Sequence, residues 1–328
     1  MSDSKLQLLT IGDTTTDVFM ALIDASVLKR PEKRGDKLCL RFGDKIAVES
    51  VQEIEGVGNA SNVAVGATRL GLRTGIWTIL GNDDDGQRIV KDVFEKEGIS
   101  KDNVSFDRKE RTNYSLVLTY NAERTILSYH APRVYEWPNN LPSSDWVYFT
   151  SLGQGWEKIV PDFLDYVNKT GCKVAFNPGS VQLRSDMAVL KKILAVTKIL
   201  FVNREEAEKI SDCKADSMKE LLLKTKEMGP SNIIITDGVN GAFALLNDEY
   251  WTMPVLPTEV IERTGCGDSF ASGFLSATST GKSDDEALLW GAVNASSVIR
   301  YVGSHEGLLS CDALVQNLEK LTIKAQKI

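Results

Sequence analysis

The sequence predicts an α/β fold with a mostly parallel central sheet and a second, smaller β-sheet. Through most of the 328 residues, short apolar runs alternate with amphipathic stretches long enough to form helices. Strands that alternate with helices in this way form βαβ units, whose strands are parallel. Two stretches, residues 17–55 and 112–133, lack a long helical period and carry short alternating runs instead. Such insertions would most simply form a small separate sheet.

Each expected element follows from its local pattern. Buried strands are predicted at residues 6–12, 74–80, 146–150, 173–177, 198–202 and 232–236. Helices are predicted at residues 59–71 and 84–98, and further amphipathic helices lie between the later strands. In the second insertion, alternating residues 113–120 and 124–130 flank a turn at residues 121–123, which predicts a β-hairpin. The charged tail after Leu321 predicts a frayed helix.

The composition is that of a globular protein and argues against several partners. Hydrophobic residues make up 42% and charged residues 25% of the chain, and the net charge is −7. An acidic balance disfavours nucleic-acid binding, which depends on clustered Lys and Arg. No apolar run approaches the length of a membrane span or a signal peptide. The five cysteines form an odd number without a CxxC pair, which is typical of a reducing compartment. We therefore expect a cytoplasmic protein that binds neither nucleic acid nor membrane.

The stretch of residues 263–274 carries the strongest chemical signal. Gly265, Cys266 and Gly267 stand directly before an apolar helical pattern. Glycines allow a tight turn there, and the first N–H groups of the following helix have no partner within it. Such donors, together with the helix dipole, bind anions such as phosphate. Asp268 at the helix start could accept a proton from an attacking hydroxyl, which is the role of the base in phosphoryl transfer. Taken alone, the pattern also fits an ordinary helix start with Asp268 as a first-turn acid.

This stretch resembles the second signature of the PfkB, or ribokinase-like, carbohydrate kinases, which reads D-T-x-G-A-G-D-S/T-F. The matching positions are Thr264, Gly265, Gly267, Asp268, Ser269, Phe270, Gly273 and Phe274. The resemblance implies that Asp268 is the catalytic base and that the turn of Gly265, Cys266 and Gly267 stabilises the transferred phosphoryl group. Glu262, Arg263 and Cys266 depart from the pattern, where the family usually has Asp, Thr and a small residue. The first two departures weaken the case for the K⁺ site that some members build there, so K⁺ stays an open cofactor.

Two carboxylates and the family's first signature mark the substrate end of the site. Gly58 and Asn62 match the second glycine and the sugar-binding asparagine of that signature, whereas Val57 replaces its first glycine. Asp13 and Asp17 follow the first predicted strand, and ligands of parallel sheets bind beyond the carboxyl ends of the strands. The resemblance makes Asp17 the sugar-contacting aspartate and Asp13 a weaker candidate. Asp13 also fits an ordinary turn or cap.

Three further motifs imply an ATP site that works with Mg²⁺. Asn203 and Glu206 fit the family's N-x-x-E motif, which organises Mg²⁺ and phosphate through water. The segment of residues 236–242 resembles the nucleotide loop T-x-G-x-x-G, and a later asparagine falls where the family lines the adenine pocket. The residues that the resemblance assigns to ATP are Asn203, Thr236, Gly238, Gly241 and Asn294.

The resemblance covers nearly the whole chain and implies a three-layer α/β/α domain. Residues 1–16, 56–111 and 134–328 would form this domain, and residues 17–55 and 112–133 would form a β-sheet lid. In the family the lid covers the sugar and often joins two subunits, so a homodimer through the lid is expected. The implied activity is ATP-dependent, in-line phosphorylation of a hydroxymethyl group of a sugar.

Three alternatives stay open at this point. The segment of residues 177–179 is similar to nucleoside-preferring members, so the substrate could be a nucleoside. The departures from the signatures also fit a catalytically silent sensor of sugars or nucleotides. A dinucleotide-binding oxidoreductase is the weakest alternative, because the third glycine of its fingerprint would be Ser61.

Overall fold

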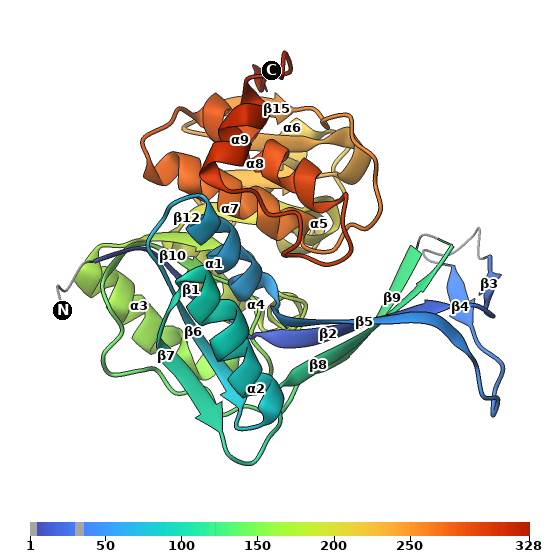
Figure 1. Cartoon of the computed structure of the whole chain (residues 1–328). Helices are drawn as coiled ribbons and strands as arrows, with labels where there is room; N and C mark the ends of the chain where they lie inside the picture. The colour runs from blue at the N-terminus through green and yellow to red at the C-terminus, as the bar shows by residue number, and fades with distance from the viewer. Residues whose placement is uncertain (1–4, 30–35, 122) are drawn as a thin grey trace.

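The centre of the molecule is a ten-stranded sheet within residues 5–29, 36–121 and 123–328, which the computed structural model describes (Figure 1). The strand order is β16-β15-β14-β13-β12-β11-β10-β1-β6-β7. Neighbouring strands are parallel from β13 to β7 and antiparallel from β13 to β16, which confirms the predicted mostly parallel sheet. The strands are β1 (Leu6–Ile11), β6 (Thr74–Gly81), β7 (Ser100–Asp107), β10 (Ser144–Phe149), β11 (Lys173–Phe176), β12 (Thr197–Asn203), β13 (Asn232–Thr236), β14 (Ala242–Leu246), β15 (Glu249–Met253) and β16 (Gln326–Lys327).

The central strands are apolar on both faces because helices cover both. In β1, the adjacent residues Leu8 and Leu9 are both fully buried and belong to different hydrophobic clusters. Side chains alternate between the two faces of a strand, so neighbouring apolar residues serve opposite layers. Leu9 pairs in register with Val147 of β10, which continues the same cluster. The sheet therefore separates two cores.

The helices form the outer two layers of the predicted three-layer arrangement, which is confirmed (Figure 1). One face carries α3 (Val160–Thr170), α4 (Met187–Val196), α5 (Arg204–Ser211) and α6 (Met218–Lys226). The other carries α1 (Asn59–Arg69), α7 (Cys266–Ser279), α8 (Asp284–Val298) and α9 (Cys311–Leu318). Short 3₁₀ turns lie at Trp156–Ile159, Gln182–Arg184 and Gly238–Asn240.

A separate four-stranded sheet projects from this body (Figure 1). Its order is β5-β2-β8-β9, with β2 (Thr15–Leu22), β5 (Val48–Val57), β8 (Asn113–Tyr120) and β9 (Glu123–Tyr129). A small hairpin of β3 (Ser26–Leu28) and β4 (Lys37–Cys39) extends it. We call the four-stranded sheet and this hairpin the lid. The predicted hairpin of residues 113–130 is confirmed, although Ala122 in its turn lies outside the described residues.

The lid is joined to the central sheet at the carboxyl end of strand β1, next to the site. β2 begins shortly after β1 ends, and β5 runs directly into α1 through Gly58. Any movement of the lid must therefore act on the segments that carry Asp13, Asp17 and Gly58.

Several elements differ from the sequence prediction, which also lacked strands β14 and β15. The helix predicted at residues 84–98 is a short α2 (Asp84–Arg88) followed by a π-helix at Ile89–Glu95. The wider turn of a π-helix brings Ile89 and Phe94, five residues apart, into one buried cluster. Strand β7 follows it and was not predicted.

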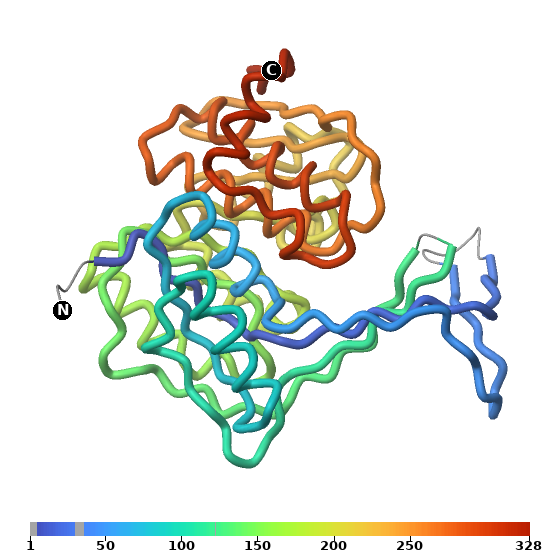
Figure 2. The backbone as a smooth tube through the Cα atoms, in the orientation of Figure 1, coloured from blue at the N-terminus to red at the C-terminus, as the bar shows by residue number. Residues whose placement is uncertain are grey.

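The predicted frayed C-terminal helix is wrong, because the tail forms strand β16 on the edge of β15. Lys327 pairs with Glu249 of β15 at 2.7 Å, so the charges of the tail hold it to the sheet. The C-terminus lies at the far end of the molecule from α2 (Figure 2).

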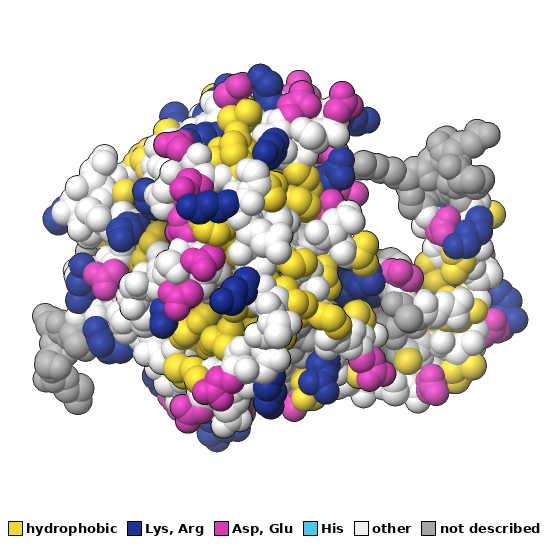
Figure 3. Space-filling model, turned by 90° about the horizontal axis from the view of Figure 1, so that it is seen from above, with side chains coloured by type: hydrophobic (Ala, Val, Ile, Leu, Met, Phe, Trp, Pro, Cys, Tyr) yellow, Lys and Arg dark blue, Asp and Glu magenta, His cyan; other side chains and the backbone are white. Residues whose placement is uncertain are grey.

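Charged side chains of both signs are interspersed over the face shown in Figure 3 and do not gather into a basic patch there. Among the described residues, no helix has the length and apolar character needed to cross a membrane.

Candidate active site

The turn before α7 presents unpaired backbone donors. Gly265 has a φ of 75° in the left-handed region, and a Cβ there would stand 2.4 Å from the Cβ of Ser304. Only glycine fits such a position. Within the described residues, the N–H groups of Cys266 and Ser269 find backbone acceptors, whereas those of Gly267 and Asp268 find none. A Cβ on Gly267 would meet no atom within 4 Å, so the space beside this residue is open. The turn has the geometry of an anion site.

Asp268 is buried beside this turn and is held by two amide groups. Asn62 Nδ2 donates to one carboxylate oxygen at 2.8 Å, and Asn59 Nδ2 donates to the other at 3.1 Å. No cationic side chain among the described residues forms a salt bridge with Asp268. Burial raises the pKa of Asp268 to about 6, the two amides lower it, and Glu206 raises it. A carboxylate with a pKa near neutrality suits a general base.

Asn59 is a residue of this site that the sequence prediction missed. Its Nδ2 also donates to Asn177 Oδ1 at 3.0 Å, and Asn177 Nδ2 in turn donates to the carbonyl of Phe201 at 2.8 Å. Asn59 and Asn62 are three residues apart at the start of α1, so they lie on one face of the helix. That spacing was the signal that could have identified Asn59.

Gly58 at the start of α1 is the second position that requires glycine. Its φ is 106°, and a Cβ would come within 2.8 Å of the carbonyl oxygen of Asp13. Gly58 thus lets α1 begin directly against the segment after β1. Ser304 supports the same helix start, because its hydroxyl donates to Asn62 Oδ1 at 2.7 Å. The structure therefore brings together three of the predicted site residues, Gly58, Asn62 and Asp268.

A cavity of about 420 Å³ opens next to the turn before α7 and gathers most of the predicted nucleotide residues. Its wall includes apolar side chains of Phe270, Val255 and Leu256, which suit a flat base. The predicted residues that line it are Asn203, Thr236, Gly238, Gly241, Cys266 and Gly267.

Asn294 does not line this cavity, which corrects its predicted place in the adenine pocket. Its side chain is fully buried between α7 and α8. Asn294 Nδ2 donates to the Ser269 carbonyl and the Ser272 hydroxyl, both at 3.0 Å, and its Oδ1 accepts from the N–H of Leu309 at 3.1 Å. Every polar atom of the amide is thereby used inside the protein. The neighbours Ala292, Ala295 and Ser296 line the cavity instead.

Asn203 and Glu206 form a reciprocal cap at the start of α5. Asn203 Oδ1 accepts from the N–H of Glu206 and Glu206 Oε2 accepts from the N–H of Asn203, both at 2.9 Å. This capping box uses one carboxylate oxygen and leaves the other without a partner in it. Burial raises the pKa of Glu206. A single carboxylate fits Mg²⁺ that is held mainly by water and substrate phosphates.

The two aspartates of the substrate end lie buried after β1. The Tyr135 hydroxyl donates to Asp13 Oδ2 at 2.8 Å, and the Gly153 N–H donates to the same oxygen at 3.0 Å. Asp17 Oδ1 is buried and has no hydrogen-bond partner in the structure. Burial raises the pKa of each aspartate to about 6. Asp13 is thus held by hydrogen bonds within the protein. Asp17 Oδ1, in contrast, has no hydrogen-bond donor among the described residues and is available as an acceptor.

Glu262 links the turn before α7 to the lid. Its Oε1 accepts from the N–H and the hydroxyl of Thr264 at 2.8 and 2.6 Å. The same oxygen lies 3.0 Å from Arg124 Nη1, which belongs to the lid strand β9. Glu262, which departs from the family pattern, therefore contacts both the turn before α7 and the lid.

Cys266 has a raised pKa of about 11, mainly through burial and then through Asp268. A thiol with such a pKa is protonated at neutral pH and is a weak nucleophile. Its small size rather than its reactivity suits it to the turn.

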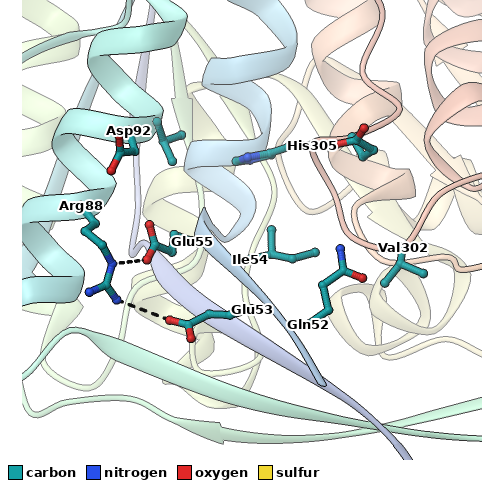
Figure 4. Close-up of a pocket in the computed structure, with 10 residues that line it drawn as sticks. Gln52, Glu53, Ile54, Glu55, Arg88, Asp92, Val302 and His305 are labelled. Carbon is teal, nitrogen blue, oxygen red and sulfur yellow. Dashed lines mark hydrogen bonds and ion pairs between the residues drawn. The ribbon is translucent and has the colours of Figure 1, made fainter. Parts of the chain in front are cut away.

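A cavity of about 690 Å³ lies away from these residues, between β5, the π-helix and the segment of Val302 to Glu306 (Figure 4). Figure 4 shows Arg88 turned toward Glu53 and Glu55, with which it forms ion pairs. None of the residues predicted for catalysis lines this cavity.

Known proteins match the chain over most of its length. The model of the pfkB family carbohydrate kinases matches residues 17–311. A nucleoside kinase of Methanocaldococcus jannaschii is 26% identical over 281 residues, which cover 84% of this chain and 89% of that protein. The bifunctional ribokinase/ribose-5-phosphate isomerase A of Fructilactobacillus sanfranciscensis is 23% identical over 87% of this chain, and the match spans only 54% of that protein.

The fold is also that of solved ribokinases. The structure of Arabidopsis thaliana ribokinase complexed with ribose and ATP superposes with a TM-score of 0.79 at 18% identity, covering 97% of this chain and 100% of that one. The likeness at this identity shows the fold. The match of the family model over residues 17–311 decides the family: the chain belongs to the pfkB family of carbohydrate kinases.

Proposed function

We propose that the protein transfers the terminal phosphoryl group of ATP to a hydroxymethyl group of a sugar or nucleoside, with Asp268 as the base. The observation that carries this proposal is the position of Asp268. Its carboxylate has a pKa of about 6 and is held by two side-chain amides. It belongs to the same turn as the backbone N–H groups of Gly267 and Asp268, which have no backbone acceptor. A base next to anion donors is the arrangement that phosphoryl transfer needs.

In the proposed reaction, Asp268 accepts the proton of the attacking hydroxyl while the N–H groups of the turn donate to the transferring phosphoryl oxygens. The cavity lined by Thr236, Gly238 and Gly241 holds the nucleotide. Mg²⁺, when bound near Glu206 and Asn203 through water, would offset charge on the phosphate oxygens. Closing the lid would exclude water, which otherwise competes as the acceptor.

The acceptor lies at the substrate end in this proposal. Asp17 is the first candidate for a hydroxyl contact, because its Oδ1 is buried without a partner and would gain one from a substrate O–H. Asn62 and Gly58 lie against Asp268 and Asp13 respectively, between the aspartates and the base. Asp13 itself serves to shape the pocket through Tyr135.

A nucleoside acceptor is the second candidate, and two observations favour it. One relative that matches 84% of this chain is named a nucleoside kinase. Asn177, which the sequence linked to nucleoside-preferring members, connects through Asn59 to Asp268. A sugar acceptor is supported by the family itself.

A coupled assay of ADP release against a panel of sugars and nucleosides tests the proposal. We expect ADP to form well above the acceptor-free rate with one acceptor class. Thermal shifts by ligands without ADP formation would contradict the kinase and support a silent sensor. Equal rates with K⁺ and with tetramethylammonium are also expected, because Arg124 and Thr264 already engage the carboxylate of Glu262.

We also propose a homodimer formed through the lid. Strand β9 is an outer strand of the lid sheet, and all of its described side chains are exposed. Ile126, Leu127 and Tyr129 expose 45%, 52% and 46% of their surface. An unpaired, apolar edge strand is a surface that a second copy can cover. The five free cysteines support a reducing compartment such as the cytoplasm.

A further inference from the structure

Two arginines flank the turn before α7, and one of them, Arg263, departs from the family's second signature. Arg124 reaches the turn from the lid strand β9, and Arg263 immediately precedes it in the chain. Both line the cavity of about 420 Å³ together with Cys266 and Gly267. They are the two basic residues in the lining of this cavity, as far as the structure describes it.

The negative charge around the cavity is the reason to expect these two residues to contribute to binding of an anionic ligand. The chain has a net charge of −7, and Asp268, Glu206 and Glu262 all stand near the cavity. A triphosphate placed there would be repelled by these carboxylates. The N–H groups at the start of α7 offset only part of that repulsion, since a helix terminus carries about half a charge. In the described lining of the cavity, the guanidinium groups of Arg124 and Arg263 supply the positive side-chain charge.

Arg124 is held in place by the protein before any ligand arrives. Its Nη1 lies 3.0 Å from Glu262 Oε1, and the Glu262 side chain is only 8% exposed. A carboxylate buried to this extent needs a cationic or hydrogen-bonding partner. Only about a third of the Arg124 side chain is exposed, and its other N–H groups remain available. A guanidinium has five donors in a planar fork, so one ion pair does not exhaust it.

Arg263 differs from Arg124 because its side chain has no partner of its own. No hydrogen bond or ion pair joins its guanidinium to any residue that the structure describes. It is exposed, yet it lines both the nucleotide cavity and a neighbouring cavity of about 540 Å³ under the lid. An unpaired guanidinium at the mouth of a phosphate site is positioned for an incoming anion.

We propose that Arg124 and Arg263 form an anion clamp that binds the distal phosphates of the nucleotide, with Arg124 delivered by the lid and oriented by Glu262. The inference rests on the proposed kinase function and adds the protein's own cationic contacts to it. Because Arg124 sits on β9, the clamp is complete only when the lid lies against Glu262. Lid position and triphosphate binding are therefore coupled.

Binding of AMP, ADP and a non-hydrolysable ATP analogue, measured by calorimetry with Mg²⁺, tests the clamp. For Arg263→Ala and for Arg124→Ala we expect a loss of about tenfold or more in affinity for the ATP analogue, the size of a lost charge-assisted hydrogen bond. The loss should shrink from the ATP analogue to ADP and be smallest for AMP. Arg41→Ala is the matched control, because Arg41 is an exposed lid arginine that pairs with Asp24 and Asp44, and it should bind all three nucleotides like the wild type.

The outcomes separate the clamp from the kinase proposal. Arg263→Ala removes a side chain without a structural partner, so its effect cannot come from misfolding, and thermal melts of both variants check this. Wild-type affinity for the ATP analogue in both variants would overturn the clamp and leave the kinase proposal standing. An equal loss for AMP and the ATP analogue would also overturn it, because the contact would then not be to distal phosphates. Failure of the wild type to bind any nucleotide would overturn the proposed function and the clamp together.

Discussion

Asp268 has a pKa of about 6 because burial outweighs the two amides that hold its carboxylate. Burial penalises the charged form, while hydrogen bonds from Asn59 and Asn62 favour it. The carboxylate of Glu206 repels a second negative charge and also raises the pKa of Asp268. Asp268 is thus ionised at neutral pH, and its pKa is still close enough to neutral pH for the carboxylate to accept a proton.

The first prediction concerns the pH dependence of turnover. The base must be deprotonated, so kcat should fall as the pH drops through about 6, the pKa of Asp268. Asn59→Ala removes a donor that favours the carboxylate, so the pKa rises and the acid limb of the profile should move to higher pH. Profiles of kcat from pH 5 to 8 measure this shift.

Asn317→Ala is the matched control for Asn59→Ala, because Asn317 lies on the surface of α9 and donates only to its own helix. Its profile should coincide with that of the wild type. An unmoved acid limb in Asn59→Ala would show that the amide does not act on the base.

Part of the site could be predicted from single residues and part could not. Gly265, Gly267 and Asp268 stand in one local pattern, so their geometry was predictable from turn and helix-start chemistry. The bond from Asn59 to Asn177 joins residues 118 positions apart, and only the assembled fold brings them together. Asn294 was predicted to line the nucleotide site, but its amide makes all of its hydrogen bonds within the protein. The sequence does not show whether a polar residue on a helix bonds to the protein or to a ligand.

At the scale of elements, α7 combines a function at its start with packing along its length. Its first turn faces the cavity of about 420 Å³, whereas the rest of the helix packs against α1 and α8. Two of its glycines distinguish these roles. A Cβ on Gly267 would meet nothing within 4 Å, but one on Gly273 would come within 2.7 Å of the Trp290 carbonyl oxygen.

The second prediction uses this pair of glycines. Gly273→Ala should lower the free energy of unfolding by about 1–3 kcal/mol, the usual cost of overpacking, because backbone atoms of α8 must move. Gly267→Ala should leave the melting temperature near that of the wild type and lower kcat by about 10²-fold, since its methyl group displaces the phosphoryl group. Thermal melts and ADP release on both variants give the two readouts. Loss of stability in Gly267→Ala, or normal turnover in a folded Gly267→Ala, would contradict the assigned role of the turn.

Elements with a strong period were predictable, and those that depend on partners were not. The buried strands and α1 carry dense apolar patterns, because they are covered on several sides. β16 is a short polar strand that forms only because β15 offers an unpaired edge, and nothing in its own residues indicates a strand. The π-helix also depends on packing, since Ile89 and Phe94 share one cluster.

At the scale of the whole molecule, we propose that the lid controls access to the site and forms the contact with a second copy. The lid insertions were visible in the sequence because their period differs from that of the helices around them. The position of the lid against Glu262 was not, because the contact joins Arg124 to a residue far along the chain. Arg124 and Leu127 lie on the same strand, so the proposed closure and the proposed dimer contact would involve one element.

The third prediction concerns assembly. Sedimentation velocity of the wild type should give a dimer, and Leu127→Glu should shift it to the monomer, because a charge on β9 disfavours an apolar contact between lids. Leu223→Glu is the matched control, since Leu223 is an exposed leucine, 46% exposed, that lies on α6 and not on the lid. A wild-type monomer, or a dimer that survives in Leu127→Glu, would contradict a dimer through the lid.

The most direct test of Asp268 as the base is the turnover of Asp268→Asn with the acceptor identified in the panel. The amide has nearly the same shape and cannot accept the proton, so kcat should fall by at least about 10²-fold. Affinity for the ATP analogue and for the acceptor, measured by calorimetry, should stay within a few-fold of the wild type. Turnover equal to the wild type in the folded variant would contradict the central role of this carboxylate.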